Sequence, residues 1–178
     1  MAYICDENAR YAIGIQLSER YMKGLILNLQ GKIVGKVITK KLKFQADDIY
    51  RQEIGKLYEQ LVEANQLKET QILGVGITVE GLTDIEGERV TCSFVEEMAD
   101  ARRKELAKYI SIENRLFHDM TAAGYNQKLR RGEKVFYLSL NSSIGGTILV
   151  EDDVYNGNHN RAGEIGHMGI DPNGRKCQ

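Results

Sequence analysis

The chain has 178 residues, of which 42% are hydrophobic and 28% charged, and its net charge is −1. This length fits one domain or one and a half small ones, and the composition is that of a globular protein. The near-neutral charge gives no electrostatic footprint for nucleic acid, and no apolar segment approaches the ~20 residues that span a bilayer. The N-terminal segment has no hydrophobic stretch typical of a secretion signal. The three cysteines are far apart and predict no disulfide framework. We therefore expect a reduced, cytoplasmic protein.

The first part of the chain predicts three consecutive antiparallel strands and then a helix. The strands are marked by apolar residues that mostly alternate with period two, and they are expected at 11–17, 22–29 and 32–42. Asp47 and Asp48 supply carboxylates that favour a helix start, since they can accept from the unpaired N–H groups of the first turn. Apolar residues then recur at helical spacing to about Asn65.

The rest of the chain predicts alternating strands and helices. Segment 72–79 is a nearly continuous run of apolar and Gly residues, as expected of a strand buried on both faces. Segment 80–90 is rich in turn-forming residues and is predicted as an irregular excursion. Further strands are expected at 115–118, 135–140 and 147–150, and further helices at 102–110 and 121–129.

This order of elements predicts an α/β fold with a mixed sheet flanked by helices. A strand meander followed by helix–strand crossovers is the order of the ribonuclease-H-like half-domain of actin-like ATPases, the fold of sugar kinases. In that fold the turn between the first two strands holds phosphate. The strand pair from Val135 begins the duplicate half, so we predict an N-terminal lobe at 1–120 and an incomplete second lobe at 121–178.

The C-terminal segment holds the densest set of candidate ligand residues. The pair Gly145-Gly146 follows an apolar strand, and Glu164 and His167 lie three apart between glycines. A Gly-lined turn, a carboxylate and an imidazole in so short a span indicate a ligand site rather than a core. Because the chain ends just beyond Cys177 in a polar loop, we expect it to be a fragment of a longer protein.

These motifs resemble those of the ROK family, which groups bacterial sugar kinases with sugar-responsive repressors. The sequence AGEIGHM at 162–168 is similar to the family's ExGH segment, and NSSIGGTILV at 141–150 is similar to its second Gly-rich phosphate segment. Asp119 falls where the family carries its catalytic Asp. His167 and Cys177, ten residues apart, resemble the start of the zinc loop, in which one His and three Cys bind the metal. The resemblance covers nearly the whole chain but only about half of a full ROK module.

The resemblance implies a role for each candidate residue, and each role has a plainer alternative. Sugar binding is implied for Asp119, Glu164 and His167, and phosphate binding for Gly145 and Gly146. Asp119 could instead cap the following helix or, in a kinase, act as the catalytic base. Glu164 and His167 could be an exposed pair at a helix start, and the two glycines could simply permit a tight strand turn.

The implied zinc site is incomplete in this chain. Structural zinc takes four ligands, and His167 and Cys177 supply two of them. We therefore expect zinc in the full-length protein and a free thiol at Cys177 here.

The departures from the family pattern favour its regulator branch over its kinases. The kinases have an Asp and then a Gly-Gly-Thr turn after the first strand, where this chain has Gln16 and the run Ser18-Glu19-Arg20. Glu19 brings a like charge near a nucleotide, a repulsion on the order of 3 kcal/mol per unit phosphate charge at ~5 Å and an effective dielectric constant of ~20, before screening. Arg20 could offset part of this repulsion.

The sugar pocket also departs from the kinase pattern. His118 precedes Asp119 where the kinases have Asn, and Glu80-Gly81 replaces a Pro-Gly. In the regulator branch, a separate N-terminal helix-turn-helix domain binds DNA while the kinase-like module senses sugar.

We therefore predict the sugar-sensing effector module of a ROK-type transcriptional regulator. It is expected to bind a sugar or sugar phosphate, to form a homo-oligomer, and to reach DNA only through a domain outside this chain. The alternative is an ATP-dependent hexose kinase that uses ATP and Mg²⁺, with Asp119 as its base.

Overall fold

The computed structural model describes residues 4–126, 134–140, 144–151 and 153–175. The chain divides into two compact units, Met1–Asp119 and Met120–Gln178, and each is described by itself. None of the described helices is both long enough and apolar enough to cross a membrane.

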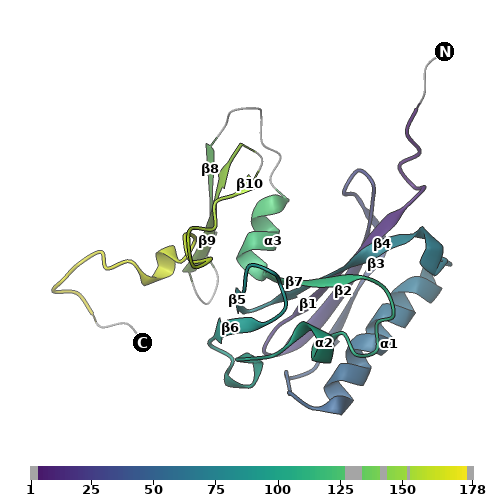
Figure 1. Cartoon of the computed structure of the whole chain (residues 1–178), viewed down its shortest axis with the longest axis horizontal. Helices are drawn as coiled ribbons and strands as arrows, with labels where there is room; N and C mark the ends of the chain where they lie inside the picture. The colour runs from purple at the N-terminus through teal and green to yellow at the C-terminus, as the bar shows by residue number, and fades with distance from the viewer. Residues whose placement is uncertain (1–3, 127–133, 141–143, 152, 176–178) are drawn as a thin grey trace. The chain divides into compact units, whose positions relative to one another are not determined.

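The first unit is built on a five-stranded sheet (Figure 1) with the order β3-β2-β1-β4-β7. The strands are β1 (Tyr11–Leu17), β2 (Tyr21–Asn28), β3 (Ile33–Lys41), β4 (Ile72–Val79) and β7 (Asn114–His118). The β1–β2 and β2–β3 pairs are antiparallel, whereas β4 runs parallel to both β1 and β7. This mixed sheet confirms the predicted ribonuclease-H-like, actin-like ATPase fold.

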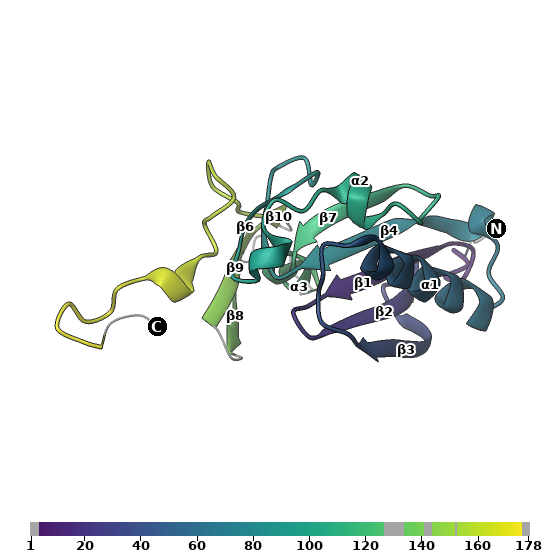
Figure 2. The same ribbon diagram turned by 90° about the horizontal axis from the view of Figure 1, so that it is seen from below.

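Helix α1 (Asp48–Ala64) covers one face of this sheet, as Figures 1 and 2 show. The buried residues of β1 alternate with partly exposed ones as its sequence predicts. On α1, Leu57 and Leu61 are fully buried. They pack over Gly24 of β2 so closely that a Cβ there would lie 2.6 Å from Leu61 Cδ1 and 3.2 Å from Leu57 Cγ. The absence of a side chain at Gly24 therefore lets helix and sheet approach.

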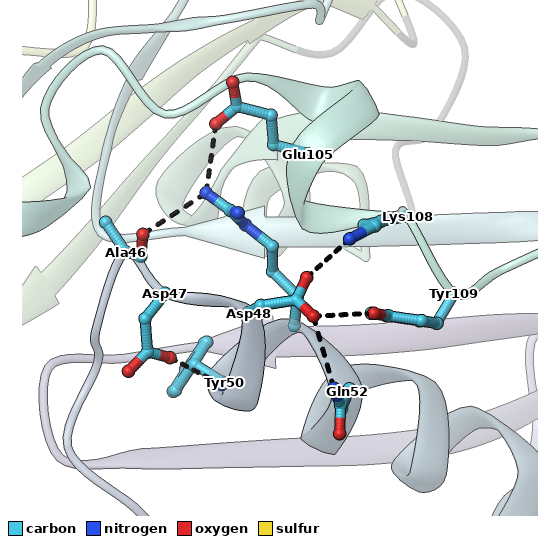
Figure 3. Close-up of polar contacts among 9 residues, drawn as sticks. Ala46, Asp47, Asp48, Tyr50, Gln52, Glu105, Lys108 and Tyr109 are labelled. Carbon is cyan, nitrogen blue, oxygen red and sulfur yellow. Dashed lines mark hydrogen bonds and ion pairs between the residues drawn. The ribbon is translucent and has the colours of Figure 1, made fainter.

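The start of α1 is held by polar contacts (Figure 3). Asp47 is the N-cap and accepts from the Tyr50 N–H at 2.8 Å, which confirms the predicted helix start. Asp48 accepts from Lys108 Nζ at 2.7 Å, from the Tyr109 hydroxyl at 2.8 Å and from Gln52 at 3.2 Å. These three hydrogen bonds, the one from Lys108 foremost, lower the pKa of Asp48 to about 2. The network ties the helix to the segment around Lys108.

Two parts of the first unit differ from the sequence prediction. Segment 80–90 is not wholly irregular, because β5 (Gly81–Thr83) pairs with β6 (Val90–Ser93) in a small antiparallel hairpin. The helix expected at 102–110 is reduced to α2 (Arg103–Leu106). Tertiary contacts override the helical pattern beyond it, since Tyr109 lies directly against Gly55 of α1 and also donates to Asp48. Short 3₁₀ turns occur at Glu69–Gln71 and Glu96–Met98.

The second unit contains a three-stranded antiparallel sheet with the order β10-β9-β8. Its elements are β8 (Lys134–Leu140), β9 (Ile144–Val150), β10 (Asp153–Val154), the 3₁₀ helix η3 (Ile165–His167) and the greater part of α3 (Asp119–Tyr125). α3 begins at Asp119, two residues before its predicted start, and the predicted continuation to Leu129 lies outside the described residues. Gly124 of α3 packs against Thr147 of β9 without room for a side chain.

Candidate functional site

The carboxyl ends of three neighbouring strands of the first unit carry polar residues side by side. Leu17 of β1 pairs with Val79 of β4, and Val79 pairs with His118 of β7. The residues that follow these positions are Ser18, Glu80 and Asp119. Ligands of open α/β sheets bind outside the carboxyl ends of the strands. The register therefore places the candidate ligand residue Asp119 and the β1–β2 turn along one edge of the sheet.

The β1–β2 turn at Ser18–Arg20 is fixed by backbone hydrogen bonds. The Ser18 N–H donates to the Tyr21 carbonyl at 2.9 Å, which closes the turn. The Glu19 carbonyl accepts from the Phe44 N–H at 2.8 Å, and the Arg20 carbonyl accepts from Leu42 at 3.1 Å. The chain that follows β3 thus holds the turn from one side.

The side chain of Glu80 reaches this turn from the end of β4. Its Oε1 accepts from the Ser18 hydroxyl at 2.5 Å, and its Oε2 accepts from the Glu19 N–H at 2.8 Å. The Glu19 carboxylate itself lies 3.4 Å from Arg20 Nε, and both of these side chains are exposed. Sequence reasoning identified Glu80 as a departure from the family pattern but did not predict its contact with the turn.

Asp119 lies where β7 ends and α3 begins. The neighbouring His118 Nε2 is 3.3 Å from its Oδ1, and the two side chains are only 15% and 18% exposed. The carboxylate thus faces an imidazole in a partly buried setting. Helix α3 starts at Asp119 itself, two residues before the predicted start at Thr121. Its role as a sugar ligand or catalytic base remains a prediction.

The GEIGH segment of the second unit, residues 163–167, packs directly against the backbone of β9. A Cβ on Gly163 would collide with the Gly146 carbonyl oxygen, and a Cβ on Gly166 would collide with that of Ile144. Only glycine allows such a close approach of two backbones. The two glycines therefore fix the position of Glu164 between them.

Glu164 and His167 form a pair within this seated segment. His167 Nε2 lies 3.5 Å from Glu164 Oε2, and the side chains are 55% and 27% exposed, respectively. Glu164 precedes η3, but its carboxylate makes no capping hydrogen bond to the described residues of that turn. The carboxylate is thus held in place with acceptor capacity for hydroxyl donors.

Close packing around Gly145 and Gly146 leaves no room for a side chain at either position. A Cβ on Gly145 would lie 2.9 Å from Met120 Cγ, and one on Gly146 would lie 2.7 Å from the Tyr137 carbonyl oxygen and 3.0 Å from Ile165 Cδ1. These contacts explain both glycines without a ligand. Their assignment to phosphate binding remains a prediction.

Of the two predicted zinc ligands, only His167 lies among the described residues. Among the described residues, no three or more His, Cys, Asp or Glu side chains cluster as a metal site would require. His167 is available to solvent, and Cys177 lies outside the described residues. A structural zinc site takes four ligands, and zinc binding by His167 and Cys177 remains a prediction.

The strand order β3-β2-β1-β4-β7 is that of the actin-like ATPase fold, which ROK regulators and sugar kinases share. The model of the ROK family matches residues 12–178, and the chain belongs to this family. It spans about half the length of the relatives that it matches.

Similar proteins include both regulators and kinases. The xylose repressor of Bacillus subtilis (strain 168) is 26% identical over 182 residues, which cover 98% of this chain and 46% of the repressor. A ROK family transcriptional regulator that is a homolog of the E. coli MLC protein superposes with a TM-score of 0.79 at 21% identity, over 96% of this chain and 44% of that one. The ROK family glucokinase of Streptomyces griseus, solved with glucose and AMPPNP, superposes with a TM-score of 0.72 at 16% identity. The match covers 92% of this chain and 52% of the glucokinase.

Proposed function

We propose that this chain is part of the sugar-sensing effector module of a ROK-type transcriptional regulator. The observation that carries the proposal is a contrast between two segments. Glu164 lies in the GEIGH segment, whose close contact with the backbone of β9 requires glycine at 163 and 166. The β1–β2 turn, in contrast, has no glycine and carries Glu19. The similarity to xylose repressors over 98% of the chain supports the same assignment.

Each candidate residue has a defined role in this proposal. The Glu164 carboxylate accepts hydrogen bonds from sugar hydroxyls, and His167, 3.5 Å away, orients it. Asp119, with His118 beside it, binds a further hydroxyl without chemistry. A sugar or sugar phosphate is the expected ligand, and an aldopentose such as xylose is the first candidate because of the named relatives.

Regulation would follow from a shift between conformations. A sugar that binds one arrangement of the full-length protein better than another shifts the population towards it, by no more than its difference in affinity. This shift would change the geometry of DNA-binding domains outside this chain, in a cytoplasmic homo-oligomer. The loop that begins at His167 would bind zinc once the remaining ligands are supplied.

Calorimetric titration of the full-length protein with aldopentoses, aldohexoses and their phosphates tests the proposal. At least one sugar should bind, and Glu164→Gln should weaken it about tenfold or more, since hydrogen bonds to charged groups contribute roughly 1.5–3 kcal/mol. Glu86→Gln, an exposed carboxylate in the β5–β6 turn, is the matched control and should leave affinity unchanged. No binding at millimolar concentration, or equal affinity for the Glu164→Gln variant, would refute the assignment.

The second candidate is an ATP-dependent hexose kinase. It is favoured by the partly buried Asp119 at the carboxyl end of β7 and by the fold similarity to a glucokinase. In this reading Asp119 removes the proton of the attacking hydroxyl. A coupled assay of ADP release with hexoses and MgATP separates the two candidates. Turnover that Asp119→Asn abolishes would establish the kinase.

A further inference from the structure

The β1–β2 turn has the donors of an anion site, and they converge on one carboxylate. The Ser18 hydroxyl and the Glu19 N–H donate to the two different oxygens of Glu80, at 2.5 and 2.8 Å. An anion that accepts one hydroxyl and one backbone N–H through separate oxygens makes the contacts that a phosphoryl group makes in such a turn. The chain thus places its own anion where this fold holds phosphate.

Glu80 is held in this position by the chain on both sides. Its predecessor Val79 pairs with Leu17, the residue before the turn. Its carbonyl accepts from the Ser93 hydroxyl at 2.6 Å. Its successor Gly81 lies so close to the β6 strand that a Cβ would be 2.6 Å from the Cys92 carbonyl oxygen. The carboxylate is therefore preorganised on the turn.

Three further backbone groups of the turn are engaged within the protein. The Ser18 N–H is used by Tyr21, and the carbonyls of Glu19 and Arg20 are held by Phe44 and Leu42. Ser18 is only 1% exposed. A phosphate that took the Ser18 hydroxyl and the Glu19 N–H would have to displace a carboxylate that accepts both, at 2.5 and 2.8 Å.

The buried residues near Glu80 strengthen the repulsion between its carboxylate and an approaching phosphate. Tyr50 is 2% exposed, and its hydroxyl has no hydrogen-bond partner among the described residues. Burial, and secondly the negative charge of Glu80, raise the pKa of the Tyr50 hydroxyl. Charges act more strongly on one another in such a poorly solvated region than in water.

We infer that Glu80 is a specificity-determining residue whose carboxylate occupies the phosphate turn of this chain and excludes nucleotide. The exclusion is both steric and electrostatic, since a polyphosphate would meet the Glu80 charge at contact distance. The inference concerns the nucleotide turn alone and stands whether or not the protein binds a sugar.

Pyrophosphate and Mg–AMPPNP are the probes for the test, titrated calorimetrically into the full-length protein. The wild type should bind neither at the turn. Glu80→Ala frees two donors and removes one charge, so it should bind pyrophosphate at least about tenfold more tightly than the wild type. Glu80→Gln removes the charge but keeps the volume, and it should show a smaller gain. Glu86→Gln is the control for a charge change elsewhere.

A second substitution tests whether a gain in pyrophosphate affinity arises at the β1–β2 turn. Ser18→Ala in the Glu80→Ala background should abolish most of the new affinity, because the hydroxyl is one of the two freed donors. If Glu80→Ala does not fold, the pyrophosphate affinity of Glu80→Gln is compared with that of the wild type instead. The inference is overturned if a folded Glu80 variant binds pyrophosphate no better than the wild type. It is also overturned if the gain survives Ser18→Ala, or if the wild type binds Mg–AMPPNP at this turn.

Discussion

Gly166→Ala should lift the GEIGH segment off β9. The new Cβ would collide with the Ile144 carbonyl oxygen, which is backbone. Ile144 belongs to the β8–β9 ladder opposite Leu140, so the strand cannot move aside without loss of sheet pairing. The segment must move instead, and Glu164 and His167 move with it. Overpacking of this kind typically costs about 1–3 kcal/mol.

The free energy of sugar binding should become less favourable by the same amount if binding requires the GEIGH segment to be packed on β9. Because about 1.4 kcal/mol corresponds to tenfold, Gly166→Ala should weaken binding by roughly 5- to 150-fold. Gly169→Ala is a close control, three residues on, because a Cβ there would meet no atom within 4 Å. Calorimetric titration and thermal unfolding of both variants give the comparison. Equal sugar affinity and equal melting temperature for the two variants would refute the reasoning.

Two further predictions concern the packing and the electrostatics of the first unit. Gly24→Ala should lower the free energy of unfolding by about 1–3 kcal/mol because its Cβ would lie 2.6 Å from the buried Leu61. Gly14→Ala in the adjacent strand should be neutral or stabilising, since its nearest contact is an ordinary 3.5 Å; denaturant unfolding of both variants should show a loss of stability for Gly24→Ala alone. Asp48→Asn should reduce the loss of stability between about pH 4 and pH 2. The lowered pKa of Asp48, held mainly by Lys108, confers stability above its ordinary pKa that is lost as pH falls through about 2; an identical acid-unfolding profile for the variant would contradict this.

Local sequence patterns predicted most of the sheet. The bounds of β1 and β4 match the predicted strands at 11–17 and 72–79 because each carries a strong apolar pattern of its own. The β5–β6 hairpin was missed because its strands have only three and four residues and lie among turn-forming residues. The helix after it was overestimated because Tyr109 is engaged by α1 rather than by its own helix.

The candidate site was predictable to the extent that it is local. Glu164 and His167 lie three residues apart in a Gly-flanked segment, so their pairing could be read from spacing. The contact of Glu80 with Ser18 joins residues 62 apart in the sequence, and no periodicity reports it. It depends on the parallel register of β1 and β4, which only the folded sheet provides.

The central claim is that this ROK chain keeps a carbohydrate site while its own carboxylate fills the nucleotide turn. A crystal structure of the full-length protein grown with its sugar and with Mg–AMPPNP tests this most directly. We expect sugar density in contact with Glu164, and Glu80 still hydrogen-bonded to Ser18 with no phosphate on the turn. Nucleotide phosphates on Ser18–Arg20 with Glu80 displaced would contradict it.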